Sequence, residues 1–201
     1  MNHARPAIAK PVHLNDDPPD GEIIARSRSE PELFALLFRR HATGIGRYAA
    51  RRLGPGPAED VAAETFLIAF RQRDRYDPAR PDARPWLYGI AGNLIRRHQR
   101  DEVRQLRALA RTGVDPVGES FTDRADARLA AGATSRVVAA AIAELDADQR
   151  DVLLLITWAE LTYDQAAEAL GIPEGTVRSR MNRARTRLRA ALGGTDPTSI
   201  A

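Results

Sequence analysis

Side chains that can hydrogen-bond to nucleic acid are concentrated between positions 176 and 192, a segment with six arginines and no acidic residue. At 100° per residue, one stripe of a helix here is apolar: Val177, Met181, Ala184 and Leu188. The opposite side is polar and has arginines on both flanks: Ser179, Asn182, Arg183 and Thr186 lie between Arg178, Arg180, Arg185 and Arg187. Guanidinium, amide and hydroxyl groups donate hydrogen bonds to base edges and phosphates. The pattern therefore predicts a helix that binds in the major groove of DNA.

A short turn joins this helix to a preceding one. Thr162 and Gln165 form a capping-box pattern that opens the first helix, and Gly171 is suited to end it. Pro173 has the backbone angle required at the start of the second helix. Together these features predict a helix-turn-helix. A solvated arginine-rich surface is the alternative, but the short turn and the absence of acidic residues favour contact with DNA.

A second arginine-lined helix is predicted in the middle of the chain, from Pro85 to about Leu109. Its basic face contains Arg97, Arg100, Arg104 and Arg107, with Asn93 and Arg96 beside them. The opposite face must be buried against other helices and contains Leu87, Ile90, Ala91 and Leu94. Gly89 and Gly92 lie toward the basic side, where missing side chains would let a nucleic-acid backbone approach closely.

Three aromatic residues precede or begin this helix: Tyr76, Trp86 and Tyr88. Aromatic rings stack on unpaired bases, so a platform for single-stranded nucleic acid is one interpretation. Burial in the hydrophobic core is the other. We expect Trp86 to be a core residue, whereas both interpretations stay open for Tyr76, which falls in a loop.

Composition limits the classes of protein that the chain can be. The chain has 201 residues, 28% of them charged and 43% hydrophobic, as expected for one large or two small soluble domains. Cysteine is absent, which excludes disulfides and thiolate metal sites. No apolar run reaches the ~18 residues that a membrane span requires. These features favour a cytoplasmic protein, and no cofactor or metal ion is expected.

The periodicity predicts an all-α chain of two small helical domains joined by a flexible linker, the second containing the helix-turn-helix. The N-terminal residues are rich in Pro and Asp without periodicity, which predicts disorder. Helical spacing covers residues 33–53 and, beyond a Gly-Pro break, residues 57–73. In the second block, Asp146 and Gln149 predict a capped helix. The expected divisions are a disordered extension (1–28), a first domain (29–109), a linker (110–134), a second domain (135–193) and a tail (194–201).

Five segments, in this order, resemble the extracytoplasmic-function (ECF) sigma factors, small sigma-70-type initiation factors of bacterial RNA polymerase. The segments are AEDVAAETFLIAF, DRYDP, RPWLYGIAGNLIRR, LDADQRDVLLL and LTYDQAAEALGIPEGTVRSRMNRAR. The resemblance covers about residues 30–192 and includes both domains of the family, which are called region two and region four. It implies that the chain is not an enzyme but a factor that binds core RNA polymerase and directs promoter-specific initiation of transcription.

The resemblance also implies three sets of contact residues. The positions that bind core polymerase are Asp60, Ala63, Glu64 and Leu67. Those that recognise and open the −10 promoter element, where a flipped base is held, are Tyr76, Ile90, Asn93, Arg96, Arg97 and Arg100. Those that recognise the −35 element are Thr176, Arg178, Ser179, Arg180, Asn182 and Arg183. Which of these arginines contact bases and which contact phosphates stays open.

The partners that the resemblance implies are core RNA polymerase, through its β′ clamp helices and its β flap, promoter DNA, and an anti-sigma factor that holds the chain inactive. The chain departs from the family pattern at three positions. Ala63 stands where members often have glutamine, and Gly89 and Gly92 stand where a larger, often basic residue is common.

Two other functions are compatible with parts of the sequence. A stand-alone helix-turn-helix regulator would use residues 135–192 but would leave the acidic helix and the arginine-lined middle helix without a role. A helical metal-dependent hydrolase would use Glu59, Asp60 and Glu64 with His98. Against the hydrolase, the four histidines are scattered, and neither a Gly-rich phosphate loop nor regular metal-ligand spacing is present.

Overall fold

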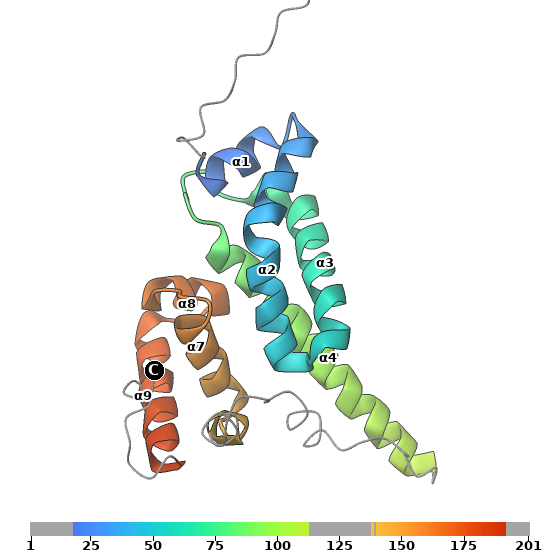
Figure 1. The fold of residues 1–201 in the computed structure, drawn as a ribbon, viewed down its shortest axis with the longest axis vertical. Coiled ribbons are helices and arrows are strands. Elements are labelled where there is room, and N and C mark those ends of the chain that lie inside the picture. The colour runs from blue at the N-terminus through green and yellow to red at the C-terminus, as the bar shows by residue number, and fades with distance from the viewer. Residues whose placement is uncertain (1–17, 113–137, 139, 192–201) are drawn as a thin grey trace, which may run out of the picture.

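The computed structural model describes residues 18–112, 138 and 140–191, with the backbone alone for residues 102–112, and the regular elements in these ranges are helices (Figure 1). The N-terminal module contains α1 (Asp20–Arg26), η1 (Pro31–Leu33), α2 (Phe34–Leu53), α3 (Pro55–Gln72), η2 (Arg73–Arg75) and α4 (Arg84–Thr112). The C-terminal module contains α7 (Ala147–Thr157), α8 (Tyr163–Leu170) and α9 (Glu174–Ala191), preceded by helical residues at 138 and 140–143. The all-α prediction is confirmed. Among the described residues, none of the helices is long and apolar enough to cross a membrane.

Helices α2, α3 and α4 pack around one hydrophobic core in the N-terminal module. Its fully buried side chains include Leu37, Val61 and Leu87, one from each helix. Gly54 joins α2 to α3 with φ of 87°, a backbone angle that favours glycine, so the chain can reverse within one residue. Helix α3 consequently begins at Pro55, two residues before the predicted start.

The prediction of disorder over residues 1–28 is wrong for residues 18–28, because residues 20–26 form α1. Ile23 and Ile24 of this helix are buried in the core. Asp20 accepts hydrogen bonds from Arg40 and His41, each at 2.8 Å, and from the backbone N–H of Ala83 at 3.0 Å. These tertiary contacts with α2 and with the segment before α4 stabilise α1, and local composition does not reveal them. Residues 1–17 lie outside the described residues.

The helix-turn-helix of the C-terminal module forms as predicted. Thr162 and Gln165 make both hydrogen bonds of a capping box at the start of α8, and Gly171 ends that helix in the left-handed conformation with φ of 64°. The apolar stripe of α9 is buried against α7 and α8: Val177, Met181, Ala184 and Leu188. Local sequence signals therefore determined this motif.

The predicted side-chain cap at the start of α7 does not form. Asp146 does occupy the N-cap position, but its side chain makes no hydrogen bond to the helix backbone. Its carboxylate instead accepts a hydrogen bond from the Gln149 side chain at 3.0 Å and pairs with Arg187 of α9 at 3.0 Å. A long-range charge pair has replaced the local cap.

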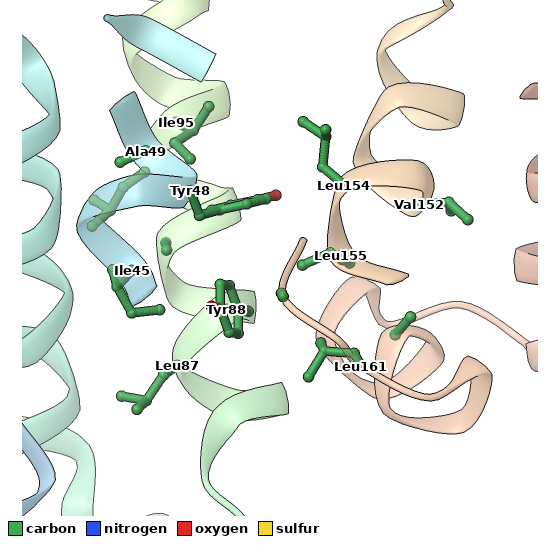
Figure 2. Close-up of a cluster of buried hydrophobic side chains, with 14 of the residues drawn as sticks. Ile45, Tyr48, Ala49, Leu87, Tyr88, Ile95, Val152, Leu154, Leu155 and Leu161 are labelled. Carbon is green, nitrogen blue, oxygen red and sulfur yellow. The ribbon is translucent and has the colours of Figure 1, made fainter. Parts of the chain in front are cut away.

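The two modules contact each other, which the expected flexible tether did not predict. Helix α8 packs along α4. Figure 2 shows Tyr48 and Tyr88 of the N-terminal module across the boundary from Leu154, Leu155 and Leu161 of the C-terminal module, within one cluster of buried side chains. Helix α4 continues to Thr112, three residues past its expected end, and the rest of the predicted linker, apart from residues 110–112, lies outside the described residues.

Candidate nucleic-acid interface

Helix α9 lies on the outer side of the C-terminal module, with α7 between it and the N-terminal module (Figure 1), and most of its polar side chains are exposed. Ser179, Asn182 and Arg183 are among the exposed residues, and Thr176 is half-buried near the start of the helix. Arg183 has no ion-pair partner among the described residues. Its guanidinium is therefore available to a ligand without first losing an acidic partner.

Two further arginines predicted to contact DNA are held by carboxylates of the same module. Arg178 pairs with Glu174 one turn earlier at 2.5 Å, and its guanidinium lies over the Tyr163 ring at 5.0 Å. Arg180 pairs with Asp148 of α7 at 2.6 Å. Exposed pairs of this kind are worth about 1 kcal/mol or less, so a phosphate can replace the carboxylate at small cost. The pairs therefore position the two arginines and still leave them available to DNA phosphates.

The predicted polymerase-binding face of α3 is accessible. Asp60 and Ala63 are exposed, Glu64 is half-buried, and Leu67 is 47% exposed. Phe38 of α2, also 47% exposed, packs its ring on Phe66 of α3 at 4.9 Å. The surface thus combines carboxylates with exposed apolar side chains, a composition typical of a protein-binding patch. Sequence reasoning missed Phe38 because it lies one turn after the buried Phe34 and has the spacing of a core residue.

Tyr76 is a core residue in this structure. Its ring is 6% exposed and lies 4.8 Å from the Trp86 ring, and its hydroxyl donates to the carbonyl oxygens of Arg80 and Asp82 at 3.1 and 3.2 Å. Burial raises the pKa of the Tyr76 hydroxyl, so the group stays protonated and acts as a donor. Of the two interpretations of Tyr76, the structure shows the buried one. Trp86 is half-buried against the core, as expected.

The remaining predicted −10 residues lie on the exposed side of α4. Asn93, Arg97 and Arg100 are exposed, and Ile90 is half-buried. Arg96 differs from them, because its guanidinium contacts both modules. It donates to the Asn93 side chain at 2.7 Å and pairs with Asp151 of α7 at 3.1 Å. Arg104 and Arg107 of the predicted stripe have side chains outside the described residues.

The prediction that nucleic acid approaches α4 at its glycines is corrected at Gly89. A Cβ atom at this position would lie 2.9 Å from the carbonyl oxygen of Ala169 in α8. The space left by the missing side chain is therefore filled by the backbone of the chain's own C-terminal module. At Gly92, by contrast, the nearest atom to an added Cβ is the Arg96 guanidinium at 3.8 Å, an ordinary contact distance.

Charged residues also join the modules, a role that sequence reasoning assigned to none of them. Arg52 of α2 pairs with Asp151, and the two side chains are 2% and 5% exposed. The only local signal was an acid, Asp151, directly before the apolar run VLLLI. Between the modules, a cleft of about 460 Å³ is lined by several basic side chains: Arg40, Arg47, Arg51 and Arg84.

The hydrolase alternative lacks a metal site in the described part of the chain. No group of three or more His, Asp or Glu side chains there is placed to hold a metal ion. Of the acidic residues of α3 proposed for that function, Glu59 and Asp60 are exposed and Glu64 is half-buried, and they do not form a metal-binding group.

Comparison with known proteins identifies matches over both modules. The family described as sigma-70 region 2 matches residues 37–105, and that described as sigma-70, region 4 matches residues 135–188. The ECF RNA polymerase sigma factor SigC of Mycobacterium tuberculosis (strain CDC 1551 / Oshkosh) is 38% identical over 147 residues, which cover 73% of this chain and 76% of SigC. SigL of M. tuberculosis (strain H37Rv) is 35% identical over 167 residues, 82% of this chain and 91% of SigL.

A solved structure is similar over most of the chain. The structure of CnrH in complex with the cytosolic domain of CnrY matches with a TM-score of 0.64 and 27% identity, covering 87% of this chain and 97% of CnrH. A sigma factor CnrH is known from Cupriavidus metallidurans (strain CH34), and it is 30% identical to this chain over 187 residues, which cover 89% of this chain and 97% of that relative.

Proposed function

We propose that this chain, which belongs to the extracytoplasmic-function sigma factors of the sigma-70 family, divides promoter recognition among separate surfaces of its two modules. A sigma factor of this type binds core RNA polymerase and directs promoter-specific initiation of transcription. The observation that supports the division best is the exposed arginine and amide face of α9, on a helix-turn-helix whose buried side is complete. A stand-alone regulator is disfavoured because the chain matches region 2 as well as region 4 of the family.

Helix α9 is proposed to recognise the −35 element from the major groove. Arg183 is our choice for a base contact, since it has no acidic partner among the described residues and arginine paired to guanine is the commonest specific contact in this groove. Asn182 and Ser179 extend the same face. Arg178 and Arg180 are proposed to exchange Glu174 and Asp148 for phosphates, with Thr176 near the backbone at the start of the helix.

The exposed side of α4 is proposed to bind the −10 element after its strands separate. Asn93 would contact the edge of a flipped base, Ile90 would form an apolar wall, and Arg96, Arg97 and Arg100 would bind phosphates. A flipped base costs a few kcal/mol in lost stacking and pairing, which these contacts must offset. Tyr76 joins such a pocket only if its two hydrogen bonds and its contact with Trp86 are lost.

Core polymerase is proposed to bind the acidic and apolar face of α3. Asp60 and Glu64 would pair with basic residues of the β′ clamp helices, while Ala63, Leu67 and Phe38 supply apolar contact area. The C-terminal module would contact the β flap. Because polymerase and promoters are cytoplasmic, we place the chain in the cytoplasm. CnrH is in complex with the cytosolic domain of CnrY, and we propose that an anti-sigma factor likewise binds this chain.

Simultaneous binding of the two promoter elements requires the modules to separate. Elements centred near −10 and −35 lie roughly 25 base pairs apart, or roughly 85 Å along the helix axis at ~3.4 Å per pair. In the structure, Arg96 and Asp151 of the two modules are 3.1 Å apart. The form described here is therefore a closed one, and we propose that it opens when promoter and polymerase are bound.

Run-off transcription with purified core polymerase on a promoter library tests the proposal. Arg183→Ala is expected to lower transcript yield about tenfold or more on templates that depend on the −35 element, and Asn93→Ala on templates that are hard to open. Arg71→Ala, at an exposed position without an assigned role, is the matched control. Normal initiation by both variants on every template would contradict the site assignment. Failure of the wild-type chain to form a stoichiometric complex with core polymerase would instead favour a stand-alone regulator.

A further inference from the structure

We infer that the arginine-lined cleft between the two modules is a binding site for a nucleotide, which the cleft recognises through both its phosphates and its base. The cleft has a volume of about 460 Å³, a size typical of small-molecule sites and too small for a protein domain or a DNA duplex. Arg47 and Arg51 of α2 line it from the N-terminal module, and Trp158 and Glu160, just after α7, line it from the C-terminal module. The site does not depend on the division of promoter contacts proposed above.

One stripe of α2 faces the cleft. Its members recur at intervals of four, three and four residues, which places them on one side of the helix: Arg40, Gly44, Arg47 and Arg51. Arg47 and Arg51 are one turn apart, and like charges at this spacing repel each other and weaken a helix. An anion bound between the two guanidinium groups would remove this repulsion.

The arginines of the cleft differ in whether the chain neutralises them. Two are paired with carboxylates of their own module: Arg40 with Asp20 and Arg84 with Asp82. Arg47 and Arg51 are exposed and form no ion pair with a described residue. The next residue of α2, Arg52, does receive a carboxylate, that of the buried Asp151 in α7. The interface thus supplies an acid to Arg52 and leaves the positive charge beside it available to a ligand.

The wall from the C-terminal module presents an aromatic ring and one acidic residue. Trp158 is 42% exposed, and the Arg51 guanidinium lies over its ring at 3.7 Å, a stacking contact that leaves the N–H groups of the guanidinium edge able to donate. Among the described residues other than glycine, Glu160 alone has a positive φ, of 53°. Strain of this kind persists mainly at functional sites. The Glu160 carboxylate forms no ion pair with a described residue, although four arginines line the same cleft.

The hydroxyl of Tyr88 lies among the charges of both walls. Burial raises the pKa of Tyr88, nearby Arg84 and Arg47 oppose this rise, and Glu160 adds to it. The hydroxyl therefore stays protonated and can donate to a ligand. Gly44 leaves space beside it, because a Cβ at that position would lie 3.1 Å from the Tyr88 hydroxyl oxygen.

These groups match the two ends of a nucleotide. Guanidinium groups donate parallel pairs of hydrogen bonds to phosphate oxygens, which suits Arg47 and Arg51. A carboxylate only accepts hydrogen bonds, so Glu160 suits the N–H groups of a base, and the exposed part of the Trp158 ring offers the base an apolar contact. Inorganic phosphate would use the arginines alone, and an acidic peptide would be repelled by Glu160. Guanine presents adjacent ring and amino N–H groups to a carboxylate, whereas adenine presents only its amino group, so a guanine nucleotide is expected to bind best.

Isothermal titration calorimetry on the full-length chain tests the site. The probes are guanosine diphosphate, adenosine diphosphate, inorganic phosphate and a peptide of eight glutamates, all at one ionic strength. We expect one guanosine diphosphate to bind per chain, more tightly than adenosine diphosphate and much more tightly than phosphate. Because the two walls belong to different modules, the bound nucleotide should also raise the melting temperature of the chain. Tighter binding of the peptide, equal binding of phosphate, or no binding of any probe would each overturn the inference.

Arg47→Ala places the ligand in the cleft. It is expected to weaken guanosine diphosphate binding about tenfold or more, as the loss of a charged hydrogen-bond donor does. Arg39→Ala, at an exposed arginine of the same helix that does not line the cleft, is the matched control. Arg183→Ala separates this site from the proposed DNA-binding face and should bind the nucleotide as the wild type does. A loss in either of these variants as large as that in Arg47→Ala would mean that the nucleotide binds to basic surface in general.

Glu160 variants test recognition of the base. Glu160→Gln replaces one acceptor oxygen by a donor and should bring guanosine diphosphate and adenosine diphosphate to nearly equal affinity. Glu160→Gly should do the same while keeping or raising the melting temperature of the free chain, because glycine adopts a positive φ without strain. Loss of discrimination without loss of stability separates a binding role from a structural one. An unchanged preference for guanosine diphosphate in both variants would refute the role of Glu160.

Discussion

Helices α4 and α9 both carry an arginine-rich face opposite an apolar stripe, yet the structure treats them differently. The arginines of α9 are exposed or paired with carboxylates of their own module, and the rest of its polar face is exposed. The face of α4 is partly covered by α8, and Arg96 is bound by Asp151 of the other module. The same amphipathic pattern thus gives an accessible surface in one module and a partly covered one in the other. Which outcome occurs depends on tertiary neighbours and not on the helix itself.

The largest expected effect concerns the buried stripe that fixes the orientation of α9. Met181 is 1% exposed, so Met181→Ala should leave a cavity and lower the free energy of unfolding of the C-terminal module by about 2–5 kcal/mol. Thermal unfolding followed by circular dichroism measures this loss. The exposed neighbour Asn182→Ala serves as the control, and an unchanged melting temperature for Met181→Ala would mean that α9 is not packed as described.

Helices α9 and α4 should also differ in how the loss of one arginine affects DNA binding. Arg183→Ala is expected to weaken binding to duplex −35 DNA by about 10- to 100-fold and to reduce discrimination between sequences. Arg97→Ala on α4 is expected to leave duplex binding by the free chain nearly unchanged. Fluorescence anisotropy over a range of salt concentrations checks both variants. Equal losses for the two would show that the helices are not functionally distinct.

The anchoring of α4 at its start depends on Asp20. Burial alone would raise the pKa of Asp20, but hydrogen bonds from His41, the Ala83 backbone and Arg40 lower it from 3.8 to about 2. Since the pKa is lower in the folded state, the ionised carboxylate stabilises the fold by about 2 kcal/mol above pH 4, and this stabilisation is lost as pH falls toward 2. Asp20→Asn should therefore be less stable at neutral pH and show a flatter acid limb in urea unfolding. A variant with the wild-type pH profile would contradict this role.

The smallest effect is expected at an exposed ion pair of α9. Asp148, whose side chain is 62% exposed, pairs with Arg180. Asp148→Asn should change the stability of the module by less than about 1 kcal/mol, because exposed pairs are screened by solvent and salt. It should also leave energy transfer between fluorescent labels on the two modules unchanged, in contrast to Asp151→Asn, which removes the buried charge that pairs with Arg52 and Arg96. Opening of the chain by Asp148→Asn would show that surface charge in general, and not the buried pair of Arg52 and Asp151, controls the closed form.

Local signals in the sequence sufficed where local interactions determine the structure. The Thr162 capping box, the left-handed Gly171 and the Val177 to Leu188 stripe of α9 were all predicted and are all present. Asp60, Ala63 and Leu67, which the family resemblance assigned to polymerase binding, are all exposed on α3. The family and the two regions were recognisable from the order of the motifs, and the comparisons establish the family.

The errors arose where distant segments contact one another. Helix α1 depends on Arg40, His41 and Ala83, which lie beyond any local window. The space at Gly89 was assigned to nucleic acid because nothing in the sequence identifies the Ala169 carbonyl as its neighbour. The same limit applies to Asp151, whose partners are 99 and 55 positions away. Periodicity identifies which face of a helix is apolar, but not which segment of the chain will cover it.

The most direct test of the whole account is energy transfer between labels on the two modules, measured on one preparation before and after addition of core polymerase and promoter DNA. We expect high transfer for the free chain, and low transfer in the promoter complex, where the modules bind elements roughly 85 Å apart. The same high transfer in both states, with transcription intact, would contradict a closed form that opens on the promoter.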